Sequence, residues 1–232
     1  MGDATMTPED SLALSLDTTA CNVAEAFTDA YYNALSKYRS TLSSFYCPKV
    51  ISTDSTVPSI YWNGEVYDDD LAFQSYIESL TYTWADIESL DCTVLNTRFL
   101  PAAELKGGSG DNDQDLERRM QIAVVVTGSL RLEEPAKGPM REFAETFVLI
   151  PNKDKQISAH PQFKNGWDRE WLIQTQNFRF TEWGVSELGE GQGEAMKVDG
   201  GVKNAFQGRG ARGGPARHFA AAGLFFKGKG KA

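Results

Sequence analysis

Few residues of this sequence have both the type and the setting that acid–base catalysis requires. Glu145 falls between Phe143 and Phe147, and the alternation of that run places its carboxyl on the core-facing side, which makes it the best candidate for an acid in a cavity. Asp91 is a second candidate for a buried acid, but an aspartate bonded to the backbone of its own or a neighbouring strand is the commoner arrangement. One carboxyl without a second polar group defines no reaction class, so no catalytic residue is assigned.

The other residues that could do chemistry lie where a site is not expected. His160 falls in a predicted loop and His218 in a glycine-rich terminal segment, so neither is expected to act as a base in a pocket. The stretch 107–110 resembles a phosphate-binding loop only in composition, because Asp111 and Asp113 beside it would repel a phosphate. The body of the chain has no GxSxG motif and no cluster of metal-ligand residues, and neither a metal nor another cofactor is expected.

Length, composition and cysteine content indicate one reduced globular domain with appendages. The chain has 232 residues, of which 41% are hydrophobic and 24% are charged. No apolar stretch approaches the roughly 20 residues that cross a bilayer, and residues 1–10 lack the features of a secretory signal. We therefore expect no membrane contact and a location inside the cell. The three cysteines are odd in number and widely spaced, which predicts reduced, mostly structural thiols: Cys21, Cys47 and Cys92.

The net charge of −9 conceals two regions of opposite sign. Residues 184–232 contain eight Lys or Arg and four Asp or Glu, a net of +4, so subtracting this from −9 leaves −13 for residues 1–183. A body this acidic repels a phosphate backbone. The segment 184–232 also holds 13 of the 21 glycines, so we predict that it is disordered and provides any weak RNA contact. A solubilising tail is the alternative.

The domain that must position the candidate residues is predicted to have helices first and strands after. Apolar periodicity, capping residues and proline predict three helical stretches: Val23–Leu35, Thr41–Tyr46 and Leu71–Leu80. Alternation predicts five strands, the first ending at the turn signal Asn63-Gly64: Ser59–Trp62, Ser89–Leu100, Met120–Leu132, Arg141–Ile150 and Trp171–Phe180. This order predicts an α+β fold in which helices cover one face of a mostly antiparallel sheet.

The alternation within the strands assigns their side chains to two sheet faces. The large residues Phe143 and Phe147 would point toward the helices. The small or β-branched residues of this strand and of the strand before it would point away: Ala123, Val125, Thr127, Ser129, Ala144, Thr146 and Val148. Such a face is too apolar for full solvation, so we expect the sheet of a partner subunit to cover it. A solvated face of an antiparallel sheet is the alternative.

The last strand adds polar residues to the same outward face. If Phe178 and Phe180 point to the core, Asn177 and Arg179 project from the outward side. A guanidinium covered by a partner there would need an acidic mate. We therefore predict partner-binding residues on three strands, with Arg179 making an ion pair to the partner.

Seven short segments follow one another in a specific order: Ala20-Cys21 through Ala24-Glu25-Ala26-Phe27 to Tyr31-Tyr32, Leu42 with Phe45-Tyr46, Trp62-Asn63-Gly64, Asp91-Cys92, Val125–Ser129, Phe143 with Phe147-Val148-Leu149, and Phe178–Trp183. In this order they resemble the nuclear transport factor 2-like (NTF2-like) family, and more narrowly the small subunits of nuclear mRNA export receptors. The resemblance covers residues 20–183. It implies a cone-shaped domain, a curved sheet wrapped by three helices, between a flexible N-terminus (1–19) and the Gly/Arg-rich tail (184–232).

The same resemblance implies a function without catalysis. In that branch of the family the small subunit pairs sheet to sheet with a similar domain of a large subunit, and the heterodimer carries mRNA through the nuclear pore by contacts with FG-repeat nucleoporins. It implies that Arg179 pairs with an aspartate of the large subunit and that the protein shuttles between nucleus and cytoplasm. The loops at 106–115 and 151–169 are longer than a minimal member needs, which leaves room for further contacts, such as to ribosomal subunits.

Several alternatives stay open. The chain could be a homodimeric transport factor or an RNA-granule adaptor that uses the tail for RNA contact. The family also includes dehydratases and isomerases, and an enzyme of that kind predicts an enclosed polar cavity around Glu145. Three tryptophans are candidates for contacts with FG phenylalanines or with bases, ordinary packing being the alternative: Trp167, Trp171 and Trp183.

Overall fold

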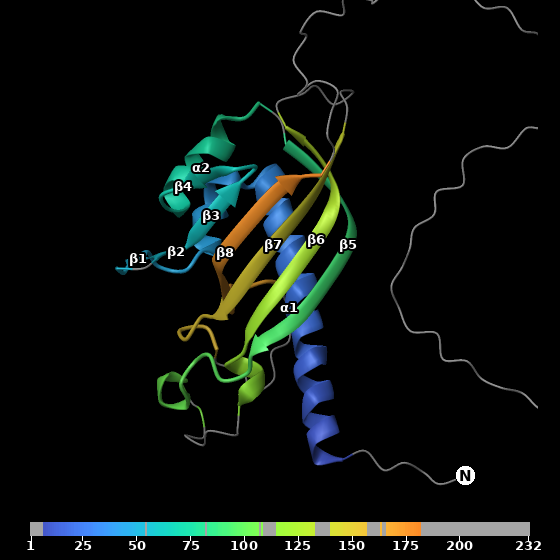
Figure 1. The fold of residues 1–232 in the computed structure, drawn as a ribbon, viewed down its shortest axis with the longest axis vertical. Coiled ribbons are helices and arrows are strands. Elements are labelled where there is room, and N and C mark those ends of the chain that lie inside the picture. The colour runs from blue at the N-terminus through green and yellow to red at the C-terminus, as the bar shows by residue number, and fades with distance from the viewer. Residues whose placement is uncertain are drawn as a thin grey trace, which may run out of the picture. The chain divides into compact units, whose positions relative to one another are not determined.

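The computed structural model describes residues 7–53, 55–81, 83–106, 108, 115–132, 140–156, 163 and 166–181. These residues form helices on one side of a six-stranded sheet, with a separate two-stranded hairpin (Figure 1). The predicted disordered tail, together with Trp183, His160 and His218, lies outside the described residues, as does most of the stretch 107–110. Among the described helices, none is both long and apolar enough to cross a membrane.

Helix α1 spans Pro8–Lys37 and begins well before the predicted start at Val23. A capping box closes its N-terminus: the N–H of Asp10 donates to Thr7 Oγ1 at 3.2 Å, and the N–H of Thr7 donates to Asp10 Oδ2 at 3.3 Å. Proline at the first helical position and acidic residues in the first turn favour the same start. The prediction of a flexible N-terminus is therefore wrong for residues 8–19. Apolar periodicity did not reveal these turns because Leu12 and Leu14 are exposed there.

Two shorter helical elements follow α1 close to the predicted positions: the 3₁₀ helix η1 (Arg39–Phe45) and the helix α2 (Asp70–Ser79). Two single-turn 3₁₀ helices were not predicted: η2 (Ala102–Glu104) and η3 (Leu116–Arg118). The carboxylate of Asp69 caps α2, because Oδ1 accepts the N–H of Ala72 at 2.9 Å. Lys49 Nζ donates to Oδ2 of the same carboxylate at 3.3 Å.

Replacing Asp69 by alanine should lower the free energy of unfolding by about 1 kcal/mol. The backbone bond from Ala72 and the contact with Lys49 hold the pKa of the Asp69 carboxyl below its ordinary value. This stabilisation is therefore present at neutral pH and is lost as the pH falls through the folded-state pKa. Urea unfolding at pH 7 would compare Asp69→Ala with Asp68→Ala, a neighbouring substitution that leaves the cap in place. Equal midpoints for the two variants would contradict the prediction.

The main sheet has the strand order β4-β3-β8-β7-β6-β5. Every neighbouring pair is antiparallel except β3 and β8, which run parallel, so the predicted mostly antiparallel sheet is confirmed. The strands are β3 (Ser59–Trp62), β4 (Glu65–Tyr67), β5 (Thr83–Asn96), β6 (Gln121–Leu132), β7 (Arg141–Pro151) and β8 (Trp171–Phe180). The separate hairpin consists of β1 (Val50–Ile51) and β2 (Thr56–Val57).

The strand predicted over Ser89–Leu100 is placed too late in the sequence. It begins at Thr83 and ends at Asn96, because a bulge between Ile87 and Ser89 breaks the alternation from which it was inferred. The strands β1, β2 and β4 have only two or three residues each, too few to produce a detectable pattern. The other three long strands agree with their predicted ranges to within one residue.

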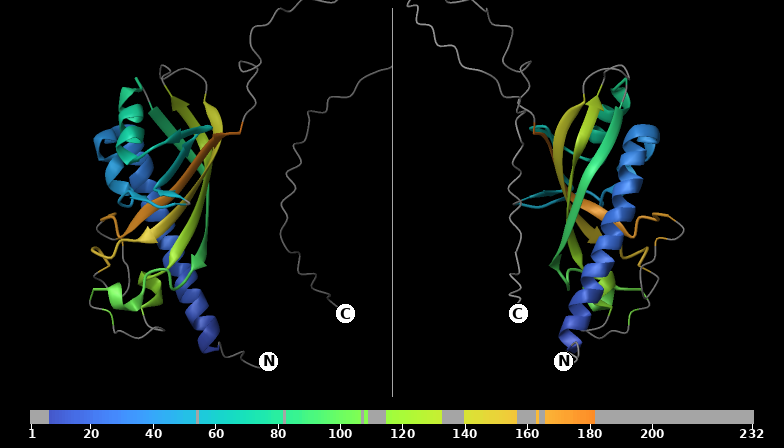
Figure 2. Two further views of the ribbon diagram at one scale, coloured as in Figure 1. Left: turned by 60° about the vertical axis from the view of Figure 1, so that its left-hand side comes forward. Right: turned by 90° about the vertical axis from the view of Figure 1, so that its right-hand side faces the viewer.

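The helices α1, η1 and α2 lie on one side of the sheet, and no described element covers the other side (Figure 2). The core fills the space between helices and sheet, where Phe27 of α1 meets Phe147 of β7 edge to face with ring centroids 4.9 Å apart. The sheet therefore has one face packed in the core and one face without a covering layer in the described chain.

Candidate partner-binding face

The register of the three central strands brings the predicted partner-binding residues onto one face of the sheet. In one row, Val125 lies opposite Thr146, and Thr146 lies opposite Asn177. The adjacent row aligns Thr127 with Ala144 and Ala144 with Arg179. We call this side the outer face, and it contains all nine predicted residues: Ala123, Val125, Thr127, Ser129, Ala144, Thr146, Val148, Asn177 and Arg179.

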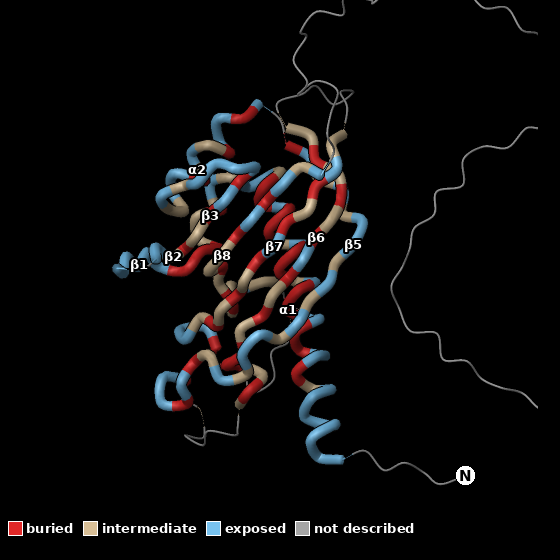
Figure 3. Tube along the Cα trace, in the orientation of Figure 1, coloured by how far each residue is buried: buried red, intermediate tan, exposed pale blue. Residues whose placement is uncertain are grey.

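Burial separates the outer face from the core-facing residues that alternate with it (Figure 3). Val125 is 38% exposed, whereas its neighbours Val124 and Val126 are completely buried. Thr146 is exposed on β7 beside Phe147, which is completely buried. The assignment of side chains to two faces is confirmed for β6 and β7. The role of the outer face in binding a partner stays a prediction.

Two apolar residues that the sequence pattern missed extend the outer face across β3 and β4. Tyr61 is 40% exposed and lies opposite Asn177, and Val66 is 66% exposed and lies opposite Tyr61. They lengthen the row of Asn177, Thr146 and Val125 to the edge of the sheet. Alternation within Ser59–Trp62 was the only sequence signal for the orientation of Tyr61. The position of β3 beside β8 could not be inferred, because this parallel pairing joins segments that are distant in the sequence.

Arg179 lies near the end of β8, beside the turn that joins β3 to β4. Gly64 occupies this turn with a φ of +97°, and a Cβ there would come within 2.9 Å of Arg179 Nη1, so the glycine leaves room for the guanidinium. Arg179 is exposed and makes no ion pair with any residue in the described part of the chain. A guanidinium held in this position can donate two parallel hydrogen bonds to a carboxylate of a partner.

Asp91 belongs to the edge of the outer face and not to the core. It lies opposite Val125, it is exposed, and its Oδ1 accepts the backbone N–H of Cys92 at 2.8 Å. The interpretation of Asp91 as a buried acid is therefore wrong, and the alternative of a bond to the backbone is confirmed. The outer face thus has a carboxylate at the β5 edge and a guanidinium on β8, with small and β-branched residues between them.

Glu145 lies on the opposite face of β7, in a buried polar cluster that the sequence did not predict. Tyr32 Oη donates to Glu145 Oε2 at 2.5 Å, and Gln176 Nε2 donates to Glu145 Oε1 at 2.6 Å. The same Gln176 amide lies 2.8 Å from the hydroxyl of Tyr31 and accepts a hydrogen bond from Tyr46. Glu145 and Gln176 are completely buried. The only sequence signal for this cluster was one polar residue within the apolar run of each strand, Glu145 on β7 and Gln176 on β8.

The Glu145 carboxyl is held on both of its oxygens by side chains of the core. Both carboxyl oxygens accept hydrogen bonds from side chains of the protein itself, and the aromatic rings of Phe143 and Phe147 flank it along β7. Burial raises the pKa of the Glu145 carboxyl from 4.5 to about 7, although the bonds from Tyr32 and Gln176 lower it. Near neutral pH the carboxyl therefore changes between its protonated and ionised forms inside the core.

The stability of the domain should decrease as the pH rises from about 4.5 to about 7. The folded state holds the Glu145 proton more tightly than the unfolded state, so its contribution is complete below the unfolded pKa and is lost as the pH passes the folded pKa. The loss approaches about 3 kcal/mol for a shift of this size. Urea unfolding at pH 5 and pH 8 should show this slope in the native chain and a flatter slope in Glu145→Gln. Tyr32→Phe should show a steeper slope, because it loses a hydrogen bond that lowers the pKa of the Glu145 carboxyl. The same slope in native chain and Glu145→Gln would contradict the assignment.

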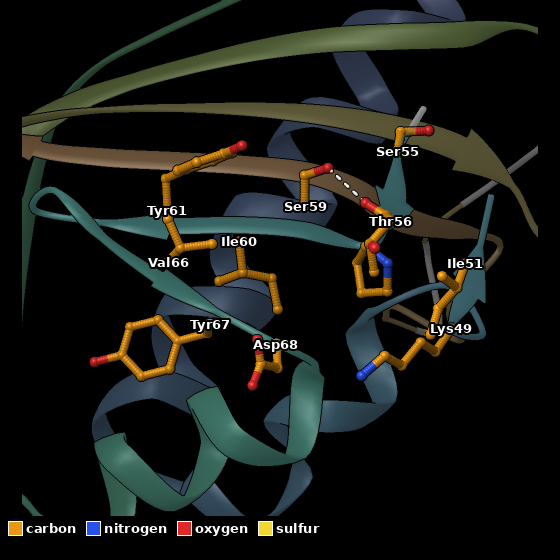
Figure 4. Close-up of a pocket in the computed structure, with 11 residues that line it drawn as sticks. Lys49, Ile51, Ser55, Thr56, Ser59, Ile60, Tyr61, Val66, Tyr67 and Asp68 are labelled. Atoms are coloured by element: carbon orange, nitrogen blue, oxygen red, sulfur yellow. Dashed lines mark hydrogen bonds between the residues drawn. The ribbon is translucent and has the colours of Figure 1, made fainter. Parts of the chain in front are cut away.

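Two surface hollows lie beside the β3–β4 hairpin, and Glu145 lines neither of them. The larger has a volume of about 490 Å³ and lies between the β1–β2 hairpin and the strands β3 and β4; Lys49, Tyr61 and Asp68 are among its lining residues (Figure 4). The smaller, of about 330 Å³, is lined by Trp62, Arg141 and Phe180 among others. Within the described ranges no group of three or more His, Cys, Asp or Glu side chains could hold a metal ion.

Of the three candidate tryptophans, the two that the structure describes are packed against the protein. Trp171 is completely buried, and its Nε1–H donates to the carbonyl of Met120 at 3.1 Å. Trp167 packs edge to face on Phe27 with ring centroids 5.7 Å apart. Ordinary packing is confirmed for both, and an exposed binding role is wrong for Trp171.

Comparison with known proteins identifies distant relatives. No protein-family model matches the sequence. The NTF2-related export protein 1 of Bos taurus is 23% identical over 164 residues, which cover 71% of this chain and 90% of that protein. A solved structure of the Chaetomium thermophilum Mex67 NTF2-like domain complexed with Mtr2 matches with a TM-score of 0.53 and 18% identity, over 69% of this chain and 98% of that chain. A structure of Mtr2 matches with a TM-score of 0.52 and 16% identity, over the same shares.

Proposed function

The chain has the nuclear transport factor 2-like fold and is a distant relative of the NTF2-related export proteins, and on this basis we propose that it is the small, non-enzymatic subunit of an mRNA export receptor. Its outer face would pair with the NTF2-like domain of the large subunit, an arrangement supported by the solved complex of the Mex67 NTF2-like domain with Mtr2. The heterodimer would carry mRNA, and further cargo such as ribosomal subunits, past the FG-repeat nucleoporins of the pore. The chain would then shuttle between nucleus and cytoplasm.

The observation that supports this function most directly is the outer face itself. Its centre consists of small and β-branched side chains, and Tyr61 and Val66 continue it with large exposed apolar groups. Arg179 stands among them without an ionic partner in the described chain. A partner sheet that covered about 800 Å² of this side, as in a standard interface, would bury the apolar groups and supply the carboxylate.

The buried cluster around Glu145 supports a structural role in place of an enzymatic one. Each oxygen of the only buried carboxyl in the described core accepts a hydrogen bond from a neighbouring side chain. The pairing function would belong to the folded domain, for which we keep the proposed range 20–183 together with the helical residues 8–19. The basic segment 184–232 would add a weak contact with RNA.

Co-expression of the full chain with the NTF2-like domain of the large export-receptor subunit from the same organism tests the proposal. We expect the two to purify as a complex with one copy of each, measured by size-exclusion chromatography with light scattering. A stable homodimer of this chain that excludes the domain would favour the homodimeric transport factor instead. A chain that stays monomeric in the presence of the domain would contradict sheet-to-sheet pairing altogether.

A further inference from the structure

Two thiols that are distant in the sequence meet between the long helix and the edge of the sheet. Cys21 lies on α1 and Cys92 on β5, 71 positions apart, and the Cys92 thiol contacts Cys21 Sγ at 3.6 Å. Cys92 faces the helix, because the residue paired with it on β6 is the completely buried Val124. The helix α1 contacts β5 along the sheet (Figure 2), so the two sulfurs belong to elements that are already packed together.

The two thiols differ in their access to solvent. Cys21 is exposed, whereas Cys92 is partly buried. Burial raises the pKa of the Cys92 thiol to about 12, with smaller contributions from the bond to Cys21 and from the carboxylates of Asp91 and Asp17. Near neutral pH Cys92 is therefore a thiol, and a reagent from solvent meets the sulfur of Cys21 first. The third cysteine, Cys47, is buried, and burial raises its pKa to about 11.

We propose that Cys21 and Cys92 form an oxidation site, in which a peroxide converts the two thiols to an intramolecular disulfide. In the first step the Cys21 thiolate attacks one oxygen of hydrogen peroxide, which gives the sulfenic acid and releases hydroxide. In the second step the Cys92 sulfur attacks the Cys21 sulfur, the S–O bond breaks, and the Cys92 proton leaves with the hydroxyl as water. The released hydroxide takes up the proton that Cys21 lost on ionising. The two thiols together therefore lose two electrons, and one peroxide is reduced to two waters.

The geometry favours closure of this bond over competing reactions. The sulfurs lie 3.6 Å apart, and a disulfide has an S–S distance of about 2.0 Å, so they need to approach by roughly 1.6 Å. The resolving thiol is already in contact with the sulfur that is oxidised, so the sulfenic acid should be trapped before a second peroxide reaches it. Metal binding is not the better assignment, because the described residues supply no third ligand beside this pair.

The disulfide would tie the first helix to the edge strand of the sheet. Because it would close a long loop of the chain, it should stabilise the folded domain by restricting the unfolded state. For a loop of this length and a domain of this size the melting temperature should rise by on the order of 10 °C. This inference is independent of the proposed function, since Cys21 and Cys92 lie on the helical side of the sheet.

Peroxide treatment of the full chain tests the proposal. The protein would be reduced, freed of reductant, exposed to hydrogen peroxide at several protein concentrations, blocked with N-ethylmaleimide and digested without reduction. We expect mass spectrometry to find a linked peptide pair that joins Cys21 to Cys92, formed at a rate independent of protein concentration. Cys47 should stay available for alkylation after unfolding. The oxidised chain should melt at a higher temperature than the reduced chain, and reductant should reverse the change.

Conservative variants separate this site from non-specific oxidation. Cys92→Ser should abolish the linked pair and leave Cys21 oxidised beyond the sulfenic state, whereas Cys47→Ser should form the linked pair at the native rate. Disulfides between two chains through Cys21 would overturn the proposal. A second contrary result would be native chain in which Cys21 and Cys92 are both recovered fully alkylated, after a peroxide exposure that does oxidise Cys21 in Cys92→Ser. A third would be an oxidised form whose melting temperature is unchanged or lower.

Discussion

Replacing Arg179 by glutamate is expected to weaken pairing with the large-subunit NTF2-like domain by at least about 100-fold, or roughly 3 kcal/mol. Arg179 projects from the outer face, and no described residue of its own chain supplies a carboxylate to it. When a partner sheet covers this side, the substitution leaves two carboxylates facing each other where one ion pair is expected. Isothermal titration of the partner domain with each variant measures the loss.

A matched control separates this effect from a general change of charge. Arg98→Glu makes the same substitution at an exposed residue in the turn after β5, away from the outer face, and should bind within about 3-fold of the native chain. Circular dichroism should show intact helices in both variants. If Arg179→Glu does not bind the partner domain, introducing arginine at the partner's paired acidic residue should restore binding. Native affinity for Arg179→Glu would contradict the role assigned to this residue.

Replacing Gly128 by alanine is expected to lower the free energy of unfolding by about 3 kcal/mol or more. Gly128 lies on the core-facing side of β6, opposite Ile87 on β5 and Phe143 on β7. A Cβ at this position would lie 2.2 Å from the carbonyl oxygen of Asp86 and 3.1 Å from Ile87 Cα. These are backbone atoms of the neighbouring strand, so the strands must separate before the methyl group fits.

The neighbouring outward residue provides the control for this prediction. Ser129→Ala removes only a surface hydrogen bond to Glu88, of 3.1 Å, and should change the stability by less than about 1 kcal/mol. Urea unfolding followed by circular dichroism measures both variants. A Gly128→Ala variant as stable as Ser129→Ala would show that the β5 bulge next to Gly128 can shift to accept a side chain, contrary to our expectation.

The residues of the outer face could be predicted because strand alternation depends on local sequence. In β6 and β7 every second residue is large or buried, so Val125 and Thr146 could be assigned to the outward side without knowledge of the pairing. The same reasoning placed Glu145 in the core, where it is completely buried. The two faces are predictable because the side-chain period of a strand is two. A shift of one residue would move every buried side chain to the outer side, so the apolar pattern fixes which residues face the core.

The features that escaped prediction depend on contacts between distant segments or on exposed residues. The parallel pairing of β3 with β8 carries Tyr61 onto the outer face, and no local pattern encodes it. The bonds from Tyr32 and Gln176 to Glu145 join α1 and β8 to β7. The first turns of α1 have exposed leucines in place of an apolar stripe, so only the capping signal at Thr7 and Pro8 could have revealed them.

Photo-crosslinking in cells of the source organism tests most directly whether a partner subunit covers the outer face. The full chain would carry p-benzoylphenylalanine at position 125, at the centre of the outer face, or at position 71, where Leu71 is 61% exposed on α2. We predict an adduct from position 125 to the sheet of an NTF2-like domain in the large export-receptor subunit, and none to that domain from position 71. Adducts from position 125 only to a second copy of this chain, or equal labelling from both positions, would contradict the account.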